Sequence, residues 1–321
     1  MSVQLAAITS PCEPLGREDF EYMLKQFVQR LGAALGLSLL VGAVPAQARA
    51  PESGRPALWS VSDADTTIYL FGTIHLLPQN FQWRTAKFNE AVSGSQQLMV
   101  ETIVDDKDPT KLMSAMANLG FAKGLPPLRE RVPAAERANL DTAIKKSGFP
   151  PQALDQMKTW AAAFILLGTQ FRELGLKGGE GVESALRTDF SGSGKPVGEL
   201  ETNLEQLGFF DRLPEASQRI LLQGAIDQGS SVHEEFAGML KAWSRGDVEG
   251  IARTFDRDLS TSPALQQALI RQRNANWSKW IERRMEQPGA VMIAVGAGHL
   301  AGKDSVLAML KKDGYSVRRL Q

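Results

Sequence analysis

The sequence predicts an α/β (α+β) fold, with a small, mostly buried central sheet and a large helical insertion. Apolar and β-branched runs, typical of strands, lie near both ends of the chain, at 58–62, 66–71, 97–100 and 290–295. Helix-period apolar positions fill the middle, from about residue 109 to residue 285. Strands that frame a chain and helices that fill its interior indicate a sheet layered against helices.

The expected elements follow in chain order. The strand at 66–71 is β-branched and aromatic and ends at Gly72. A helix at 84–94 connects it to the strand at 97–100 and gives a β-α-β unit. The next helices are expected at 109–118, 133–147, 151–174 and 182–190, separated by Gly and Pro breaks.

Beyond the loop at 191–194, residues 195–200 are expected to form a short strand that leads to Glu201. Residues 202–285 are again expected to be helical. A buried strand at 290–295, a helix at 303–312 and a last strand at 315–320 complete the chain.

Residues 23–50 have the pattern of a secretory signal peptide. Lys25 and Arg30 precede an apolar run at 31–44, and Ala46-Gln47-Ala48 is a small-x-small cleavage signal. The run is too short to span a bilayer comfortably. We therefore interpret 23–48 as a signal peptide, with a buried N-terminal helix as the alternative. The expected location is the periplasm or the exterior, with no stable transmembrane anchor after cleavage.

Residues 1–22 carry Glu13, Glu18, Asp19 and Glu21, which do not suit the start of a signal peptide. We interpret 1–22 as a mis-annotated extension, with translation starting at Met23. The globular domain is expected to cover residues 56–321.

Composition excludes some classes of function. Among 321 residues, Lys plus Arg and Asp plus Glu both number 36, so no global charge attracts nucleic acid. Cys12 is the single cysteine, so the chain can form no intrachain disulfide and no thiolate-only metal site.

A four-residue motif occurs twice, as Gly72-Thr73-Ile74-His75 and Gly296-Ala297-Gly298-His299, in a chain with three histidines. Both copies follow apolar runs that we expect to be strands. Glu101 and Glu201 likewise follow expected strands. Because sites in open α/β sheets gather at the carboxyl ends of strands, these four side chains are expected to share one site. We expect each glycine to let the chain turn sharply as it leaves the sheet.

Two imidazoles with one or two carboxylates suit a divalent ion such as Mn, Co or Zn. Such an ion lowers the pKa of a bound water, and a remaining carboxylate can serve as general base. The alternative to a metal site is that the two motifs are capped turns whose histidines form hydrogen bonds to nearby residues. His233 is interpreted as a surface residue.

Several alternatives stay open at this point. Asp105 and Asp106 compete with Glu101, although we interpret them as solvated loop acids. Glu199 competes with Glu201, because strand alternation puts both on one face. Arg273 could bind a substrate carboxylate or an anionic transition state, but solvated or salt-bridged arginines are commoner. Trp277, one helical turn from Trp280, is interpreted as core packing rather than a ligand box.

Motifs spread over residues 56–321 resemble the TraB/GumN family, which includes the pheromone-shutdown proteins and the animal Tiki proteases. They are Leu70 to Pro78, Glu101, Gly181-Val182-Glu183, Gly194 to Val197, Leu200-Glu201-Thr202 with Gln206, Ala242 to Asp247, Arg273-Asn274, Val295 to Gly302 and Gly314 to Val317. Glu183 stands where an acid, often Asp, is expected.

The resemblance implies a fold related to erythromycin-esterase and ChaN-like proteins, and a metal-dependent peptidase activity. It maps His75 and His299 to the histidine motifs and Glu101 to the acidic strand end. Glu201 and Arg273 map to further signature positions.

Together these observations predict a periplasmic metal-dependent hydrolase acting on a peptide or small-molecule substrate, through a peptide or amide bond. His75, Glu101 and His299 would hold the metal. Glu201 would be a general base or fourth ligand, and Arg273 would bind substrate. The alternatives are a protein that sequesters a peptide or envelope ligand without turnover, and a metal-independent hydrolase with a histidine base.

Overall fold

The computed structural model describes residues 54–74, 77–78, 81–104, 110–173, 181–227, 231–259 and 262–321. The expected signal peptide and the residues before it lie outside these ranges, as does His75. Within the described ranges, no helix combines the length and the apolar character needed to cross a membrane.

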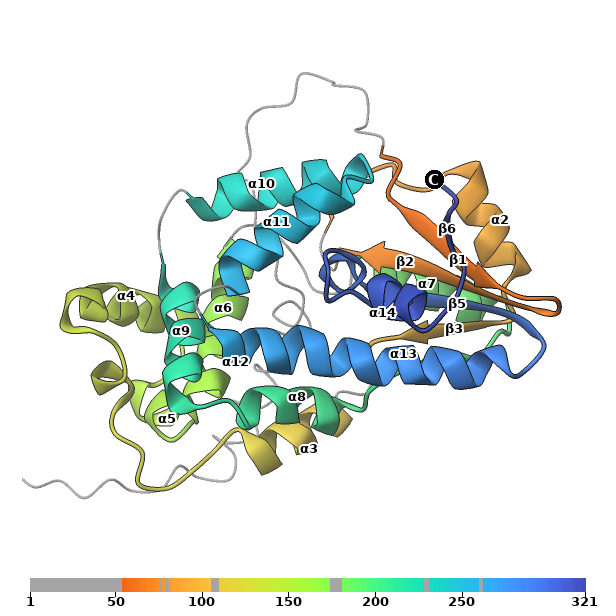
Figure 1. Ribbon diagram of the computed structural model, residues 1–321. Helices are drawn as coiled ribbons and strands as arrows, with labels where there is room; N and C mark the ends of the chain where they lie inside the picture. Colours follow the sequence, from red (N-terminus) through yellow and green to blue (C-terminus); the bar gives the residue numbers. More distant parts are fainter. Residues whose placement is uncertain are drawn as a thin grey trace, which may run out of the picture.

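The described chain contains one six-stranded sheet with the order β4-β3-β5-β2-β1-β6 (Figure 1). Its strands are β1 (Leu58–Ser62), β2 (Thr66–Thr73), β3 (Gln97–Val100), β4 (Val197–Glu199), β5 (Gly289–Gly296) and β6 (Val317–Arg319). Strands β4, β3, β5 and β2 are parallel, whereas β1 pairs antiparallel with both β2 and β6. The carboxyl ends of the four parallel strands therefore meet at one edge of the sheet.

The helices carry most of the remaining chain. They are α2 (Ala86–Gly94), α3 (Thr110–Leu119), α4 (Arg137–Ser147), α5 (Pro151–Asp155), α6 (Thr159–Glu173), α7 (Val182–Gly192), α8 (Asn203–Asp211), α9 (Glu215–Ile226), α10 (Ser231–Ser244), α11 (Val248–Leu259), α12 (Pro263–Gln266), α13 (Gln272–Met285) and α14 (Val306–Lys312). Short 3₁₀ segments lie at Leu128–Glu130, Ala134–Glu136 and Ala297–Leu300, and a π-helical segment lies at Gln267–Arg271.

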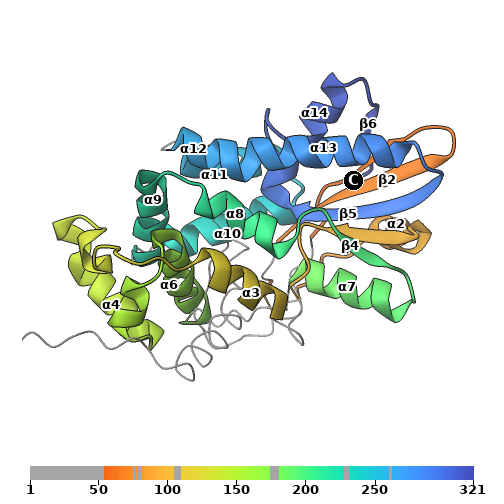
Figure 2. The ribbon, with the colours of Figure 1, turned by 90° about the horizontal axis from the view of Figure 1, so that it is seen from below.

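Both faces of the sheet are buried along its central strand β5, as expected for parallel strands. Along β5, Val291, Ile293 and Val295 pack toward α13 and α14, whereas Met292 and Ala294 pack in the cluster that includes residues of α2 and α7. This alternation follows from the period-2 geometry of a strand. Figure 2 shows α13 and α14 on one side of the sheet and α2 and α7 on the other.

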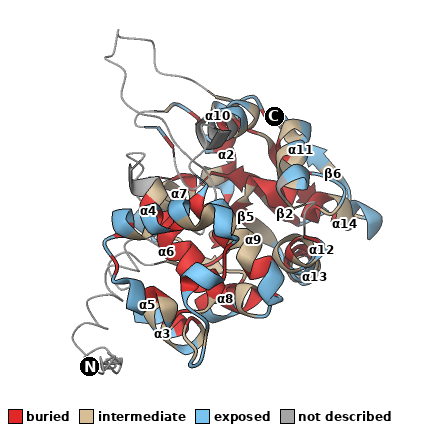
Figure 3. Ribbon diagram, turned by 90° about the vertical axis from the view of Figure 1, so that its left-hand side faces the viewer, coloured by how far each residue is buried: buried red, intermediate tan, exposed pale blue. Residues whose placement is uncertain are grey.

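A second core lies beside the sheet, among helices α3, α4, α5, α6, α8 and α9 (Figure 1). Trp160 and Leu166 of α6 are completely buried in it. Figure 3 shows buried segments running through the interior of this helical region, with exposed segments around them. The predicted fold class, a buried sheet with a large helical insertion, is confirmed.

One predicted helix, at 151–174, is wrong as a single element. The structure divides it into α5 and α6, with a break at residues 156–158. There the backbone pairs with the segment after α3: Lys158 donates to the carbonyl of Gly120, and Ala122 donates to the carbonyl of Gln156. The guanidinium of Arg131 also bonds the carbonyl of Met157. These contacts come from residues distant in sequence, so helical periodicity could not indicate them.

Candidate functional site

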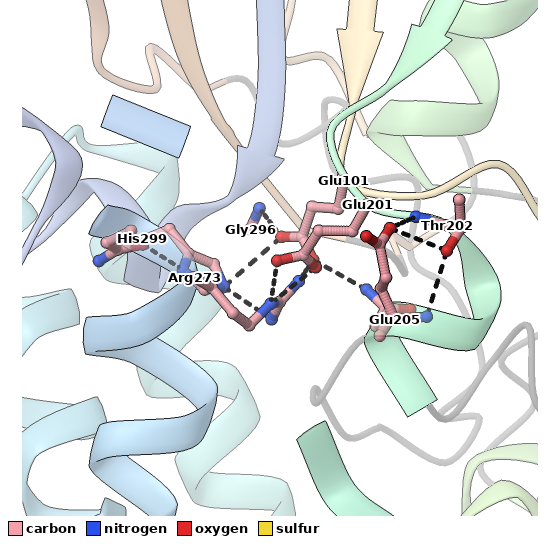
Figure 4. Close-up of polar contacts among 9 residues, drawn as sticks. Glu101, Glu201, Thr202, Glu205, Arg273, Gly296 and His299 are labelled. Atoms are coloured by element: carbon pink, nitrogen blue, oxygen red, sulfur yellow. Dashed lines mark hydrogen bonds and ion pairs between the residues drawn. The ribbon is translucent and has the colours of Figure 1, made fainter. Parts of the chain in front are cut away.

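The site lies at the edge where the parallel strands end. Register pairs Val100, the last residue of β3, with Glu199, the last residue of β4. Backbone pairing continues beyond the strands, since Glu201 donates its N–H to the carbonyl of Glu101 at 2.9 Å. The two following glutamates are therefore neighbours. The 3₁₀ segment after β5 brings His299 to the same edge (Figure 4).

Arg273, from α13, connects these three side chains (Figure 4). Its Nε donates to both carboxylate oxygens of Glu201, at 3.1 and 2.9 Å. Its Nη2 donates to Oε2 of Glu101 at 2.7 Å, and its Nη1 lies 3.2 Å from Nε2 of His299. The four residues are only 5–7% exposed. One guanidinium thus contacts two buried carboxyl groups and an imidazole.

Asn274 fixes the tautomer of His299. Its amide Nδ2 donates to the carbonyl of Asp304 at 2.7 Å, which leaves Oδ1 as the acceptor that faces Nδ1 of His299, also at 2.7 Å. The imidazole proton is therefore on Nδ1, and Nε2 carries the lone pair that accepts from Arg273. In this neutral tautomer, Nε2 can bind a metal ion or accept a proton.

The start of α13 places both residues. Arg273 and Asn274 lie in its first turn, directly after the π-helical segment Gln267–Arg271. A π-helical insertion shifts the rotational phase of the following helix and is common at functional sites. Trp277, one turn later, lies with its ring 4.4 Å from that of His299 and 4.8 Å from the guanidinium carbon of Arg273. Trp277 is thus core packing, as expected, and also one wall of the site.

Glu101 has further partners. Its Oε1 accepts from the backbone N–H of Gly296 at 2.6 Å, and its Oε2 accepts from Nε2 of Gln206 at 3.4 Å. These contacts fix its carboxylate between the end of β5 and helix α8.

Burial and neighbouring charges shift the ionisation of Glu201 and of Arg273. Burial raises the pKa of Glu201 to about 7, with Arg273 opposing this rise and Glu101 adding to it. Burial acts to lower the pKa of Arg273, but the negative charges of Glu101 and Glu201 outweigh it, and the pKa is raised. Arg273 therefore stays charged, whereas Glu201 can gain or lose a proton near neutrality.

The glycines of the two motifs allow close approach rather than an unusual backbone. None of Gly72, Gly296 and Gly298 has a positive φ. The turn expected at Gly72 is wrong, because β2 continues to Thr73, whereas the chain leaves β5 at Gly296 for the 3₁₀ segment without a left-handed glycine. A Cβ on Gly72 would lie 2.9 Å from Cα of Ala297, and one on Gly298 would lie 2.6 Å from the ring of Phe255. The end of β2 thus approaches Ala297 too closely for a side chain at Gly72, and α11 does the same at Gly298.

The structure brings together four of the five predicted site residues: Glu101, Glu201, Arg273 and His299. The fifth, His75, lies outside the described residues, although β2 runs toward it and ends at Thr73. Asp105 and Asp106 and the side chain of His233 lie outside them too.

The choice between Glu199 and Glu201 is decided by the end of β4. Glu199 bonds the backbone N–H of Ile103 at 2.7 Å, whereas Glu201 bonds Arg273. Because β4 ends at Glu199, strand alternation does not extend to Glu201. Arg271, two residues before Arg273, pairs instead with Asp304 at a partly exposed position.

Two contributions were missed from the sequence. These are the hydrogen bond from Asn274 to His299 and the backbone N–H of Gly296, and both depend on long-range contacts. The signal that points to Asn274 is its place beside Arg273 in the family motif.

A capping box follows Glu201 directly. Oγ1 of Thr202 accepts from the N–H of Glu205 at 3.2 Å, and Oε2 of Glu205 accepts from the N–H of Thr202 at 2.8 Å (Figure 4). These hydrogen bonds begin α8 and hold the pKa of the Glu205 carboxyl below its usual value, the backbone bond from Thr202 contributing most.

Replacing Thr202 with alanine is expected to lower the free energy of unfolding by about 1 kcal/mol, the usual cost of losing an N-cap. Since the pKa of Glu205 is lowered by folding, its stabilisation is present above the unfolded pKa and is lost as pH falls through the folded pKa. The variant keeps the backbone N–H of residue 202, which lowers the pKa of Glu205 most, and loses only the smaller contribution of the hydroxyl, so it should lose only slightly less stability on acidification. Urea unfolding at about pH 7 and about pH 4 measures both effects. An unchanged unfolding free energy at the higher pH would contradict the prediction.

The residues fit a divalent ion in donor type and spacing. Nε2 of His299 lies 3.7 Å from Oε1 of Glu101. Two donors to one ion can be at most about 4.2 Å apart when each bond is about 2.1 Å. In the part of the chain that is described, no three His, Cys, Asp or Glu side chains gather as a complete metal site. Two of the three predicted ligands, Glu101 and His299, are thus close enough to share an ion, and His75, the third, is not described.

Comparison with known proteins gives a family. The sequence model described as "TraB/PrgY/gumN family" matches residues 57–319. A relative from Escherichia coli (strain K12), "Uncharacterized protein YbaP", is 25% identical over 256 residues, which cover 80% of this chain and 92% of the relative. Its Shigella flexneri counterpart is 26% identical over 243 residues, covering 76% and 87%. No solved structure gives a significant match.

Proposed function

Because the chain belongs to the TraB/PrgY/gumN family, we propose that it is a metal-dependent hydrolase that cleaves peptide or amide bonds. One observation carries the proposal. His299, with its Nε2 lone pair fixed by Asn274, and Glu101 form a chelating pair beside a second buried carboxyl group, Glu201. Metallohydrolases require such a set of donors and a base next to them.

Each residue then has a chemical role. Glu101 and His299, with His75, would hold Mn, Co or Zn. A bound ion of this kind would supply a more acidic water and polarise the substrate carbonyl. Glu201 accepts the proton of the attacking water as the C–O bond forms, and returns it to the amine as the C–N bond breaks. Arg273 stabilises the negative charge that develops on the carbonyl oxygen.

Two further parts of the proposal concern the whole chain. The signal-peptide pattern at 23–48 supports secretion to the periplasm or the exterior, where a peptide substrate is available. The equal numbers of acidic and basic residues support a peptide or small-molecule substrate over a nucleic acid.

The test combines metal analysis with a cleavage screen. The purified wild-type protein and a His75→Ala/His299→Ala variant are analysed for bound metal, and both are incubated with a peptide library in Mn²⁺, Co²⁺ or Zn²⁺. We expect the wild type to hold an ion and to cleave peptides, with chelator abolishing cleavage, and the variant to lose both properties. Full metal content and activity in the variant would exclude this site. Binding of peptides without cleavage would favour a sequestering protein.

A second candidate is a hydrolase that needs no metal, and Arg273 favours it. Its guanidinium already supplies a fixed positive charge that contacts Glu101, Glu201 and His299. His299, neutral and held by Asn274, would then act as the base. Cleavage that survives chelator but is lost in His299→Ala would select this candidate.

A further inference from the structure

The terminal nitrogens of Arg273 contact the same two groups that the proposed metal ion needs. Nη1 is 3.2 Å from Nε2 of His299, and Nη2 is 2.7 Å from Oε2 of Glu101. Since Nδ1 of His299 is taken by Asn274, Nε2 offers one lone pair, and it is directed at Nη1.

Guanidinium and ion cannot use that lone pair together. A bound ion would lie about 2.1 Å from Nε2 along the lone-pair direction. Nη1 lies on the same side at 3.2 Å, so the ion and Nη1 would overlap. Like charges in a buried site repel strongly, because the local dielectric constant is low.

Other contacts hold Arg273 in this position. Its Nε bonds to Glu201 are separate from the terminal ones, and its guanidinium lies 4.8 Å from the ring of Trp277 and 5.9 Å from that of Phe209. Trp277 and Glu201 can therefore hold Nε in place, and a rotation of the rigid guanidinium about Nε is enough to move its terminal nitrogens away from His299 and Glu101 when an ion binds.

We propose that Arg273 is an internal cation that competes with the metal ion for His299 and Glu101. In the metal-free protein it neutralises Glu101 and covers Nε2 of His299. Binding of the ion displaces its terminal nitrogens, so each binding event must replace a charge-assisted hydrogen bond to Glu101 and a hydrogen bond to His299. Because of this competition, the protein binds the metal ion more weakly than the same ligands would without Arg273. This inference rests on the proposed metal site.

Metal titration of the full chain tests the competition. The protein is stripped with chelator, and isothermal titration with MnCl₂, CoCl₂ and ZnCl₂ gives Kd for wild type, Arg273→Gln and Arg273→Lys. We expect Kd for Arg273→Gln to be lower by at least about tenfold, which is about 1.4 kcal/mol. Arg273→Lys keeps the positive charge but lacks the planar guanidinium, so its Kd should lie between those of the wild type and Arg273→Gln. Arg283→Gln, an exposed position on the same helix, is the matched control and should bind as the wild type does.

The outcomes separate the competition from the proposed site. Equal Kd values in wild type and Arg273→Gln, or weaker binding in the variant, would overturn the competition while leaving the metal site in place. Absence of binding in all four proteins would overturn both. Crystals of the wild type with and without Mn²⁺ give a check that needs no variant. In the loaded protein, Nη1 of Arg273 should no longer be within hydrogen-bond distance of Nε2 of His299, and retention of that contact beside a bound ion would refute the competition.

Discussion

Replacing Glu201 with glutamine is expected to lower kcat on a peptide selected in the cleavage screen by about 10²–10⁴-fold, the usual contribution of a general base. Glutamine has nearly the same shape and still offers Arg273 an oxygen, but it cannot accept a proton. Since the substitution removes proton transfer rather than binding, KM should change little. Steady-state kinetics on the wild type and the variant measure both constants.

Glu199→Gln is the matched control, because Glu199 lies two residues earlier and bonds the backbone of Ile103 rather than Arg273. It should keep kcat within a few-fold of the wild type. If Glu201→Gln keeps its activity as well, Glu201 is not the base. The role of base then passes to His299, as in the metal-free candidate.

Replacing Arg273 with methionine is expected to destabilise the metal-free protein by about 3–5 kcal/mol, the usual cost of removing one partner of a buried ion pair. The side chain is 6% exposed and bonds both Glu101 and Glu201, so its loss leaves two buried carboxyl groups without their counter-charge. Urea unfolding in the presence of chelator measures the change in free energy.

A double-mutant cycle identifies the cause of that loss. Combining Arg273→Met with Glu101→Gln removes one of the two buried carboxyl groups left without a counter-charge and should recover part of the stability, so the two substitutions should not be additive. Arg283→Met, at an exposed position of the same helix, should change the unfolding free energy by no more than about 0.5 kcal/mol. If Arg273→Met lowers the free energy of unfolding as little as Arg283→Met does, the hydrogen bonds of Arg273 to Glu101 and Glu201 contribute little to stability.

Much of the candidate site could be predicted from the sequence, because apolar runs typical of strands are followed closely by side chains that can bind a metal ion or transfer a proton. The apolar run at 290–295 leads to His299, and the run at 97–100 leads to Glu101. Once these strands are parallel neighbours, their carboxyl ends must meet. For Arg273 the family motif adds support, since the periodicity of its helix does not distinguish it from Arg271.

The positions of the strand ends and the buried character of β5 follow from the sequence alone, because they depend on residue type and local periodicity. Tertiary structure decided the rest. Arg271 and Arg273 differ because the π-helical segment and the packing of α13 on the sheet direct Arg273 to Glu101 and Glu201. The tautomer of His299 depends on Asn274, which is 25 residues earlier in the chain. The glycines serve close packing between distant segments. Hydrogen bonds and van der Waals contacts between residues far apart in the sequence form only when the chain folds, so a local sequence pattern cannot predict them.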